Sequence, residues 1–439
     1  MAKLRSAAIV NTMNYNIDDK MKSVPLFLYG IQWAVVMIPS TIILGLVVAK
    51  LHYPGDPAAQ VFYMQKALFL TGACSIVQVL FGHQLPLVTG PASVWLAGIV
   101  AALSAGTSAI YTSVMVSGIV IVLVAASGLL RYLQLFFTPR VLIVITLLIP
   151  FTLIPTIILL VFEGDGEYLF KMAFACATML FIVVANLLLP GVWKSTTLVW
   201  AIGLATAFIA VFRGLPEWKN GTSTIAAGSA QWLISFDFNP GVILSFVISG
   251  MVLLVNQVGS MEVVGQMLDA NNMEKRSRRG ILVAGFANMA GGLTGVIGTV
   301  DYLTSTGFIS ATRCASRFPF LPAGVLIILC SLSPELVAHL LALPGLVMGT
   351  ALFYVMASQL AAGMQILVKK QAITSFYEGL SMAIPLMMTV IVSFLPKAAV
   401  AAMPVFLRPV LSNGFVVGVF TSLLLEHVIG AIYKKTGSG

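Results

Sequence analysis

The chain has 439 residues, of which 59% are hydrophobic and only 9% are charged, and its formal net charge is +9. Its mean hydropathy of +1.01 lies far above the range of soluble globular proteins. This composition excludes a soluble enzyme. It also argues against a nucleic-acid partner, because most basic residues lie at the ends of apolar stretches rather than in a basic run on a surface. We therefore expect a helical protein of the lipid bilayer.

Fourteen apolar segments follow one another along the chain, most of them long enough to cross a bilayer as a helix. They cover residues 24–48, 63–81, 86–104, 108–128, 138–161, 168–189, 196–212, 241–261, 281–297, 299–316, 320–342, 344–367, 376–395 and 409–433. The sequence therefore predicts an all-α polytopic membrane protein with 14 transmembrane segments.

The basic residues predict the orientation of these segments. An even number of spans places both termini on one side of the membrane, and 17 of the 24 Lys and Arg residues then fall on that side. Positive charge accumulates on the cytoplasmic side of membrane proteins. We therefore expect both termini to be cytoplasmic and the protein to lie in the cell inner (plasma) membrane.

The third segment contains Pro86, Gly90 and Pro91 and cannot form a continuous helix, because proline lacks an N–H group and clashes with the preceding turn. We expect an extended stretch over 84–89, followed by a half-helix that begins near Pro91, since proline suits the first helical position. Extended backbone at membrane depth is tolerated only where it is buried in protein or lines a cavity.

The tenth segment repeats this plan. Residues 299–304 favour an extended strand, and a half-helix should begin near Ser305, with Ser305 or Thr306 as its cap. The two interrupted segments are seven spans apart, which predicts a 7+7 inverted repeat with segments 3 and 10 each a short strand plus half-helix. In such folds the N-termini of the half-helices point to a substrate near the membrane midplane.

Five stretches in the same order resemble the nucleobase–ascorbate transporter family, which includes uracil, xanthine and urate permeases. They are "YGIQWAVVMIP" (29–39), "HQLPLVTGPASVW" (83–95), "TSTGFISATR" (304–313), the long apolar stretch 343–367 and the last span, 410–429. The third of these stretches is similar to the family signature Q/E/P-N-x-G-x-x-x-x-T-R/K/G.

The resemblance implies a permease, not an enzyme, that moves a nucleobase or related purine by elevator-type alternating access and works as a homodimer without a cofactor or metal. It divides the chain into a cytoplasmic N-terminus (1–23), a core domain (24–128 and 241–343), a gate domain (129–212 and 344–433) and an extracytoplasmic loop (213–240).

Family positions also imply the substrate site. Asn256 stands where the family has a Glu in span eight, and Ser260 stands where it has an Asp. Thr304 and Ser305 replace the acid-or-amide and the Asn of the signature. Both carboxylates that the family places at the substrate are therefore missing, and the amide of Asn256 can pair with a base edge but cannot titrate.

The remaining candidates follow from the same positions. Gly307, Thr312 and Arg313 keep the signature at its correct spacing, and Gly307 also belongs to the expected substrate site. Gln32 in span one and Ser93 at the start of the half-helix of the third segment complete the expected set.

Two acids are candidates for proton coupling, because charged groups inside a membrane are costly and usually functional. Asp301 precedes the signature, and it could instead be a structural tie between strand and neighbour. Glu262 lies six residues after Asn256, which is 240° around the helix, so it should face elsewhere. Transport could be coupled to protons or could be uncoupled facilitation. A small-anion transporter on the same fold is the alternative function.

Overall fold

The computed structural model describes residues 13–130, 137–164, 166–190, 193, 197–213, 232–302, 305–404 and 407–430. The first half contains α2 (Ser23–His52), α3 (Pro57–Leu80), β1 (Val88–Pro91), α4 (Ser93–Ala102), η1 (Leu103–Ala105), α5 (Thr107–Ser127), α7 (Pro139–Thr152), α8 (Ile154–Val161), α9 (Tyr168–Leu188) and α11 (Thr197–Arg213). The second half contains α12 (Pro240–Met267), α13 (Met273–Thr294), β2 (Thr299–Tyr302), α14 (Ser305–Thr312), α15 (Phe320–Ser331), α16 (Pro334–Leu341), α17 (Gly345–Lys370), α18 (Phe376–Ser393), α19 (Lys397–Ala401), α20 (Arg408–Leu411), α21 (Gly414–Leu424) and the π-helical turn η2 (Leu425–Ile429).

Every predicted segment coincides with at least one of these helices, and the predicted fold class is confirmed. Within the described residues, seven helices are long and apolar enough to cross a membrane, with α7 and α8 counted as one. The helices α15 and α16 meet at 89° across a short break, the geometry of either a broken span or a re-entrant loop. Segments 3 and 10 are each a four-residue strand followed by a half-helix, as expected.

One boundary differs from the prediction. We expected the extended stretch of segment 3 over 84–89, whereas β1 begins at Val88 and continues to Pro91. Gln84 instead adopts a positive φ of 56°, so the chain turns there before the strand starts. Pro91 pairs with Thr299 and is the last residue of the strand. The half-helix begins two residues later, at Ser93.

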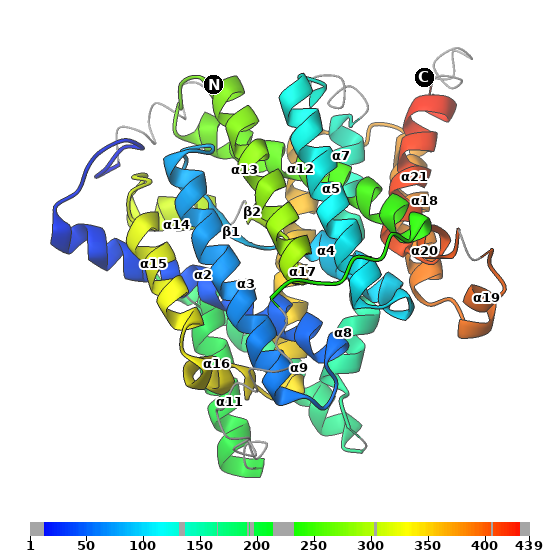
Figure 1. The fold of residues 1–439 in the computed structure, drawn as a ribbon, viewed down its shortest axis with the longest axis horizontal. Coiled ribbons are helices and arrows are strands. Elements are labelled where there is room, and N and C mark those ends of the chain that lie inside the picture. The colour runs from blue at the N-terminus through cyan, green and yellow to red at the C-terminus, as the bar shows by residue number, and fades with distance from the viewer. Residues whose placement is uncertain are drawn as a thin grey trace.

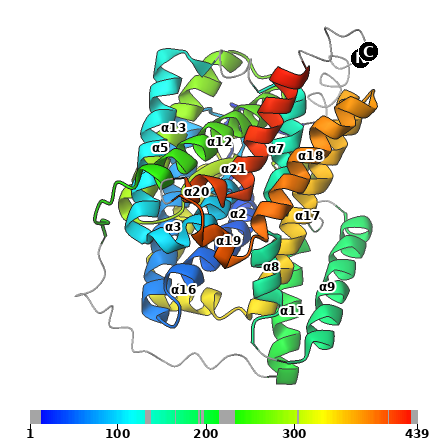
Figure 2. The same ribbon diagram turned by 90° about the vertical axis from the view of Figure 1, so that its right-hand side faces the viewer.

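The helices form two groups that lie side by side in Figure 2. In the first group, α5 packs against α12 and α13, and α15 packs against α2 and α3. In the second group, α17 packs against α7, α8, α9 and α11, while α18 and α21 pack against each other and against α7. Contacts between the groups come mainly from α2, α4 and α12 of the first group.

Glycines set the close packing inside the first group. A Cβ on Gly118 of α5 would lie 2.7 Å from the backbone N of Met289, and one on Gly285 of α13 would lie 2.6 Å from Val122. Gly72 of α3 and Gly324 of α15 each face the other's carbonyl oxygen in the same way. Small residues that let helix backbones approach are the usual means of association inside membranes.

The strands β1 and β2 lie at the centre of the molecule, enclosed by helices of the first group (Figure 1). They form a two-stranded antiparallel sheet in the register Val88↔Tyr302, Thr89↔Asp301, Gly90↔Val300 and Pro91↔Thr299. Of the eight strand residues, only Tyr302 is not fully buried. The extended backbone is therefore covered by protein, as a bilayer requires.

Candidate functional site

The register of the two strands sets the positions of both half-helices. Since the strands are antiparallel, α4 follows the end of β1 beside Thr299, and α14 follows the end of β2 beside Val88. Ala92 N–H donates to Gly298 O (2.9 Å) at one end. At the other end Ser305 Oγ accepts from Val88 N–H (2.8 Å) and donates to Tyr302 O (3.0 Å).

The half-helices therefore begin at opposite ends of the strand pair. Four residues at about 3.4 Å each separate their starts by ~13 Å. The first N–H groups of any helix lack partners within that helix, and they carry the positive end of its dipole. The strand pair thus places two partial positive charges in the centre of the molecule, one at each of its ends.

Asp301 is the buried charge of this centre, with 1% of its surface exposed. Its Oδ1 accepts from Thr89 Oγ1 (2.7 Å) on the paired strand. Its Oδ2 accepts from Gln257 Nε2 of α12 (2.7 Å) and from Gln78 Nε2 of α3 (3.3 Å). Donors from three other elements therefore surround the carboxylate.

His83 completes this network. Its Nε2 lies 3.4 Å from Asp301 Oδ2, and both side chains are fully buried. Its Nδ1 accepts from Leu85 N–H (2.9 Å), and its Nε2 is buried and makes no hydrogen bond with a described residue. We call the set of Asp301, Thr89, Gln257, Gln78 and His83 the Asp301 network.

Gln78 is fixed in one orientation by its other contacts. Its Nε2 also donates to Gly280 O (3.0 Å), and its Oε1 accepts from His83 N–H (3.4 Å). A flipped amide would bring its oxygen against the carbonyl of Gly280. Gln78 can therefore only donate to Asp301.

The aromatic residues at the strands have structural partners. Tyr302 OH donates to Pro91 O across the sheet, and its ring lies against Gly90, where a Cβ would be 2.8 Å from Cε2. Trp95 Nε1 donates to Asn288 Oδ1 (2.7 Å), and its ring stacks on Phe246 with centroids 5.6 Å apart. Both rings fix the strand pair in the protein.

The expected substrate residues of α12 lie beside this network. Asn256 is half-buried, precedes Gln257, and its side-chain amide makes no hydrogen bond with a described residue. Ser260 is buried one turn later, and its hydroxyl donates to Asn256 O (3.2 Å). Glu262 is exposed, so it does not share the buried face that carries Gln257, in agreement with its angular position.

The first span contributes two buried polar atoms. Gln32 Oε1 and Trp33 Nε1 are buried and have no hydrogen-bond partner within the described part of the chain. The ring of Trp33 is fully buried and packs between two rings, Phe308 of α14 and Phe320 of α15, with centroid distances of 4.3 Å and 4.4 Å. An acceptor and a donor that lack described partners therefore lie on α2, and Trp33 of this helix contacts α14, the half-helix of segment 10.

The other expected residues lie at the two half-helices. Ser93 is the first residue of α4 and is half-buried. Gly307 lies in α14, and Thr312 ends it with its hydroxyl donating to Phe308 O (2.9 Å). Arg313 is exposed and has a positive φ of 53°, so it terminates the half-helix. Thr304 lies outside the described residues.

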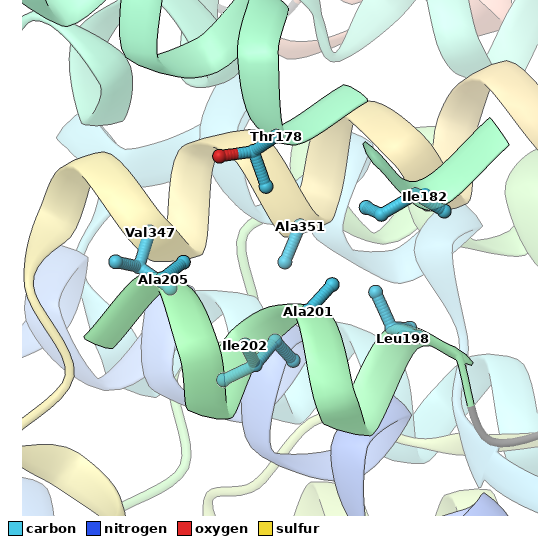
Figure 3. Close-up of a pocket in the computed structure, with 8 residues that line it drawn as sticks. All are labelled: Thr178, Ile182, Leu198, Ala201, Ile202, Ala205, Val347 and Ala351. Atoms are coloured by element: carbon cyan, nitrogen blue, oxygen red, sulfur yellow. The ribbon is translucent and has the colours of Figure 1, made fainter. Parts of the chain in front are cut away.

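A separate apolar pocket lies between α9, α11 and α17 of the second helix group (Figure 3). Its lining consists of Thr178, Ile182, Leu198, Ala201, Ile202, Ala205, Val347 and Ala351. Thr178 is the one residue there with a polar side chain, and none of the expected site residues contributes. This pocket is therefore distinct from the centre around the strand pair.

Opposed half-helices around an extended strand pair, in a bundle of membrane-spanning helices, define the class of the protein as a membrane transporter. Comparison with known families is more specific. Residues 25–398 match the model of the Permease family, Xan_ur_permease, and the chain belongs to this family of nucleobase–ascorbate transporters. Proteins of this family are permeases rather than enzymes.

The chain is similar to individual relatives over most of its length. It is 25% identical to the xanthine permease of Bacillus subtilis over 421 residues, covering 92% of this chain and 94% of that protein. It is 24% identical to the uric acid permease PucJ of the same organism over 433 residues, covering 95% of each.

Solved structures of anion transporters share the fold. The transmembrane domain of the cyanobacterial bicarbonate transporter BicA superposes with a TM-score of 0.59 at 16% identity, covering 87% of this chain and 98% of that one. Murine Slc26a9 in its inward-facing state gives a TM-score of 0.60 at 12% identity, covering 95% and 70%. These likenesses support the 7+7 inverted-repeat fold.

Proposed function

We propose that the protein is a secondary transporter of a nucleobase or related purine, and that the substrate binds between the starts of α4 and α14, next to Asn256. The observation that carries the proposal is the half-buried Asn256 amide, without a described partner, beside the opposed half-helices. The names of the relatives, xanthine and uric acid permeases, indicate the substrate class.

The chemistry of the centre suits a planar oxo-base. An amide offers a donor and an acceptor side by side, and a base edge with adjacent C=O and N–H groups is complementary to it. Gln32 Oε1 and Trp33 Nε1 add a second acceptor and donor that lack described partners. A base that pairs with these atoms would satisfy groups whose burial without partners is unfavourable.

Asp301 argues against the alternative of a small anion. Its carboxylate lies between the two half-helices and accepts from Thr89, Gln257 and Gln78. A carboxylate at this place offsets the positive dipole ends of the half-helices and disfavours an anion beside it. The likeness to bicarbonate and other anion transporters rests on fold alone at 12–16% identity.

Ligand stabilisation of the purified protein separates the two functions. Melting temperature is measured with xanthine, urate, guanine, uracil, ascorbate, sulfate and bicarbonate, since a ligand that binds the native state raises it by mass action. We expect a purine to raise it. Asn256→Ala should lose most of this shift, whereas the matched variant Asn186→Ala on α9 should keep it. Stabilisation by sulfate or bicarbonate alone contradicts the proposal.

Alternating access is proposed to move the first helix group, as the core domain, against the second, as the gate domain. The two groups meet mainly through α2, α4 and α12, which are the elements that carry Gln32, Ser93 and Asn256. The substrate would thus bind near the surface along which the groups slide. A homodimer with cytoplasmic termini in the inner membrane stays a prediction.

Proton coupling is proposed to use Asp301 rather than Glu262, which is exposed. Gln257 directly follows Asn256 and donates to the carboxylate, so a base that engages Asn256 binds beside a residue that is hydrogen-bonded to Asp301. Displacement of that donor would change the hydrogen bonding of the carboxylate during transport. Uptake of xanthine driven by an imposed pH gradient should lose its gradient dependence in Asp301→Asn. Unchanged dependence would remove Asp301 from coupling.

A further inference from the structure

The chain segment that precedes the first span runs along the segment that follows α14. Asn14 N–H donates to Arg313 O (2.8 Å), Ala315 N–H donates to Tyr15 O (2.9 Å), and Arg317 N–H donates to Ile17 O (3.1 Å). Tyr15 and Cys314 form a parallel bridge, and Ile17 is buried. We call residues 14–19 the N-terminal strap.

The carboxylate of Asp18 in the strap lies between two arginines from different parts of the fold. Its Oδ1 accepts from Arg317 Nε (2.8 Å), and its Oδ2 lies 3.6 Å from Arg276 Nη2 at the start of α13. Both arginine side chains are 16% exposed, whereas that of Asp18 is 59% exposed. One acidic residue thus orients two guanidinium groups.

Each arginine in turn binds the backbone that leads into segment 3. Arg276 Nη1 donates to His83 O (3.2 Å) and Gln84 O (2.7 Å), and Arg317 Nη1 donates to Val79 O at the end of α3. Gln84 has a positive φ, which is costly for a residue with a side chain and needs contacts to hold it. The turn that Arg276 holds also carries His83, whose ring faces Asp301.

We propose that the N-terminal strap positions the two interrupted segments relative to each other, with Asp18, Arg276 and Arg317 as its positioning residues. The strap is bonded to the exit of segment 10 through its backbone and to the entry of segment 3 through the two arginines. The inference deepens the proposed function, on which its transport consequence rests.

All these partners belong to the first helix group. These contacts therefore cannot act as an inhibitory lock that ties the core domain to the gate domain. A lock between core and gate domains would bond to both groups, and its release would speed transport. Contacts within one group instead stiffen the body that carries the substrate. Weakening them should loosen the site and lower its affinity for the base.

Hydrogen–deuterium exchange of the full chain in detergent tests the inference without a substrate. Asp18→Asn should raise exchange about two- to five-fold, the effect of losing a partly exposed ion pair, in peptides covering both 79–88 and 305–317. Arg276→Gln should raise it mainly in 79–88, where its carbonyl contacts lie. Asp18→Glu should restore part of the protection.

Two matched controls distinguish positioning from general loosening. Asp19→Asn removes the neighbouring carboxylate, which within the described part of the chain accepts only from Asn16 N–H (2.7 Å). Arg278→Gln removes an arginine of the same helix that donates to Ala125 O and Ala126 O at the end of α5. Neither should change exchange at 79–88. The inference would be overturned if Asp19→Asn raised exchange at 79–88 as much as Asp18→Asn does. It would also be overturned if Asp18→Asn raised exchange only at 313–317.

Uptake of labelled xanthine provides the functional readout. Asp18→Asn should raise KM about two- to five-fold at similar maximal rate and protein amount, and a faster maximal rate would indicate a lock and overturn the inference. If the wild-type chain does not transport xanthine, the proposed function loses its support, while the exchange result still decides whether the strap positions the two segments.

Discussion

The two interrupted segments share one backbone plan but differ in chemistry. Each is a four-residue strand followed by a half-helix, and the strands pair residue for residue. In β1, Gly90 and Pro91 provide shape, and the half-helix α4 buries an almost wholly apolar face. In β2, Asp301 provides a charge, and Ser305 ties the start of α14 to β1.

The difference shows that neither half of the repeat makes the centre alone. Segment 3 supplies the Thr89 hydroxyl that donates to the carboxylate of segment 10 and places His83 Nε2 3.4 Å from it, and α3 and α12 add the donors Gln78 and Gln257. A repeated backbone therefore carries an asymmetric set of side chains. Substitutions that remove the charge should consequently have larger effects than substitutions that only alter the pairing.

The largest effect is expected from Asp301→Ala. It leaves the donors of Thr89, Gln78 and Gln257 buried without an acceptor, and removal of one partner from a buried charged network costs about 3–5 kcal/mol. Asp301→Asn keeps the shape and one acceptor oxygen, so it should unfold at a temperature between those of Asp301→Ala and the wild type. Equal melting temperatures for Asp301→Ala and wild type would show that the network does not stabilise the fold.

A smaller effect is expected from Gly90→Ala, which tests the shape of segment 3. The added Cβ would lie 2.8 Å from Cε2 of Tyr302, so the ring or the strand must shift, at a cost of about 1–3 kcal/mol. When Tyr302 is already replaced by Ala, Gly90→Ala should cost much less stability than it does in the wild type, because the ring that the added Cβ meets is absent. Gly203→Ala on α11, where nothing lies within 4 Å of the added carbon, is the matched control.

The architecture could be predicted from the sequence because its signals are local. Runs of apolar residues gave the spans, and the prolines and glycines at 86–91 gave the interruption of segment 3. The boundary of β1 was wrong because strand pairing, a non-local contact, moved it to Val88–Pro91. The turn at Gln84 is likewise held by Arg276, which lies 192 positions away in sequence.

The site was predictable only in part, for the same reason. Asp301 was a candidate because a lone acid in an apolar stretch is conspicuous, but its partners come from α3, from segment 3 and from α12. His83 and Thr89 lie inside the stretch that carries the resemblance, yet nothing local marks them as partners of Asp301. Gln78 and Gln257 were detectable as polar residues in spans two and eight.

The smallest effect is expected from Ser305→Ala, which tests only how segment 10 is fastened to segment 3. The substitution removes the acceptor for Val88 N–H and the donor to Tyr302 O, each worth about 0.5–1.5 kcal/mol. Ser305→Thr retains the hydroxyl and should stay closer to wild type. Because the charge of Asp301 is untouched, the melting temperature should fall while the pH dependence of xanthine uptake stays unchanged. A shifted pH dependence would show that pairing and charge are not separable in this centre.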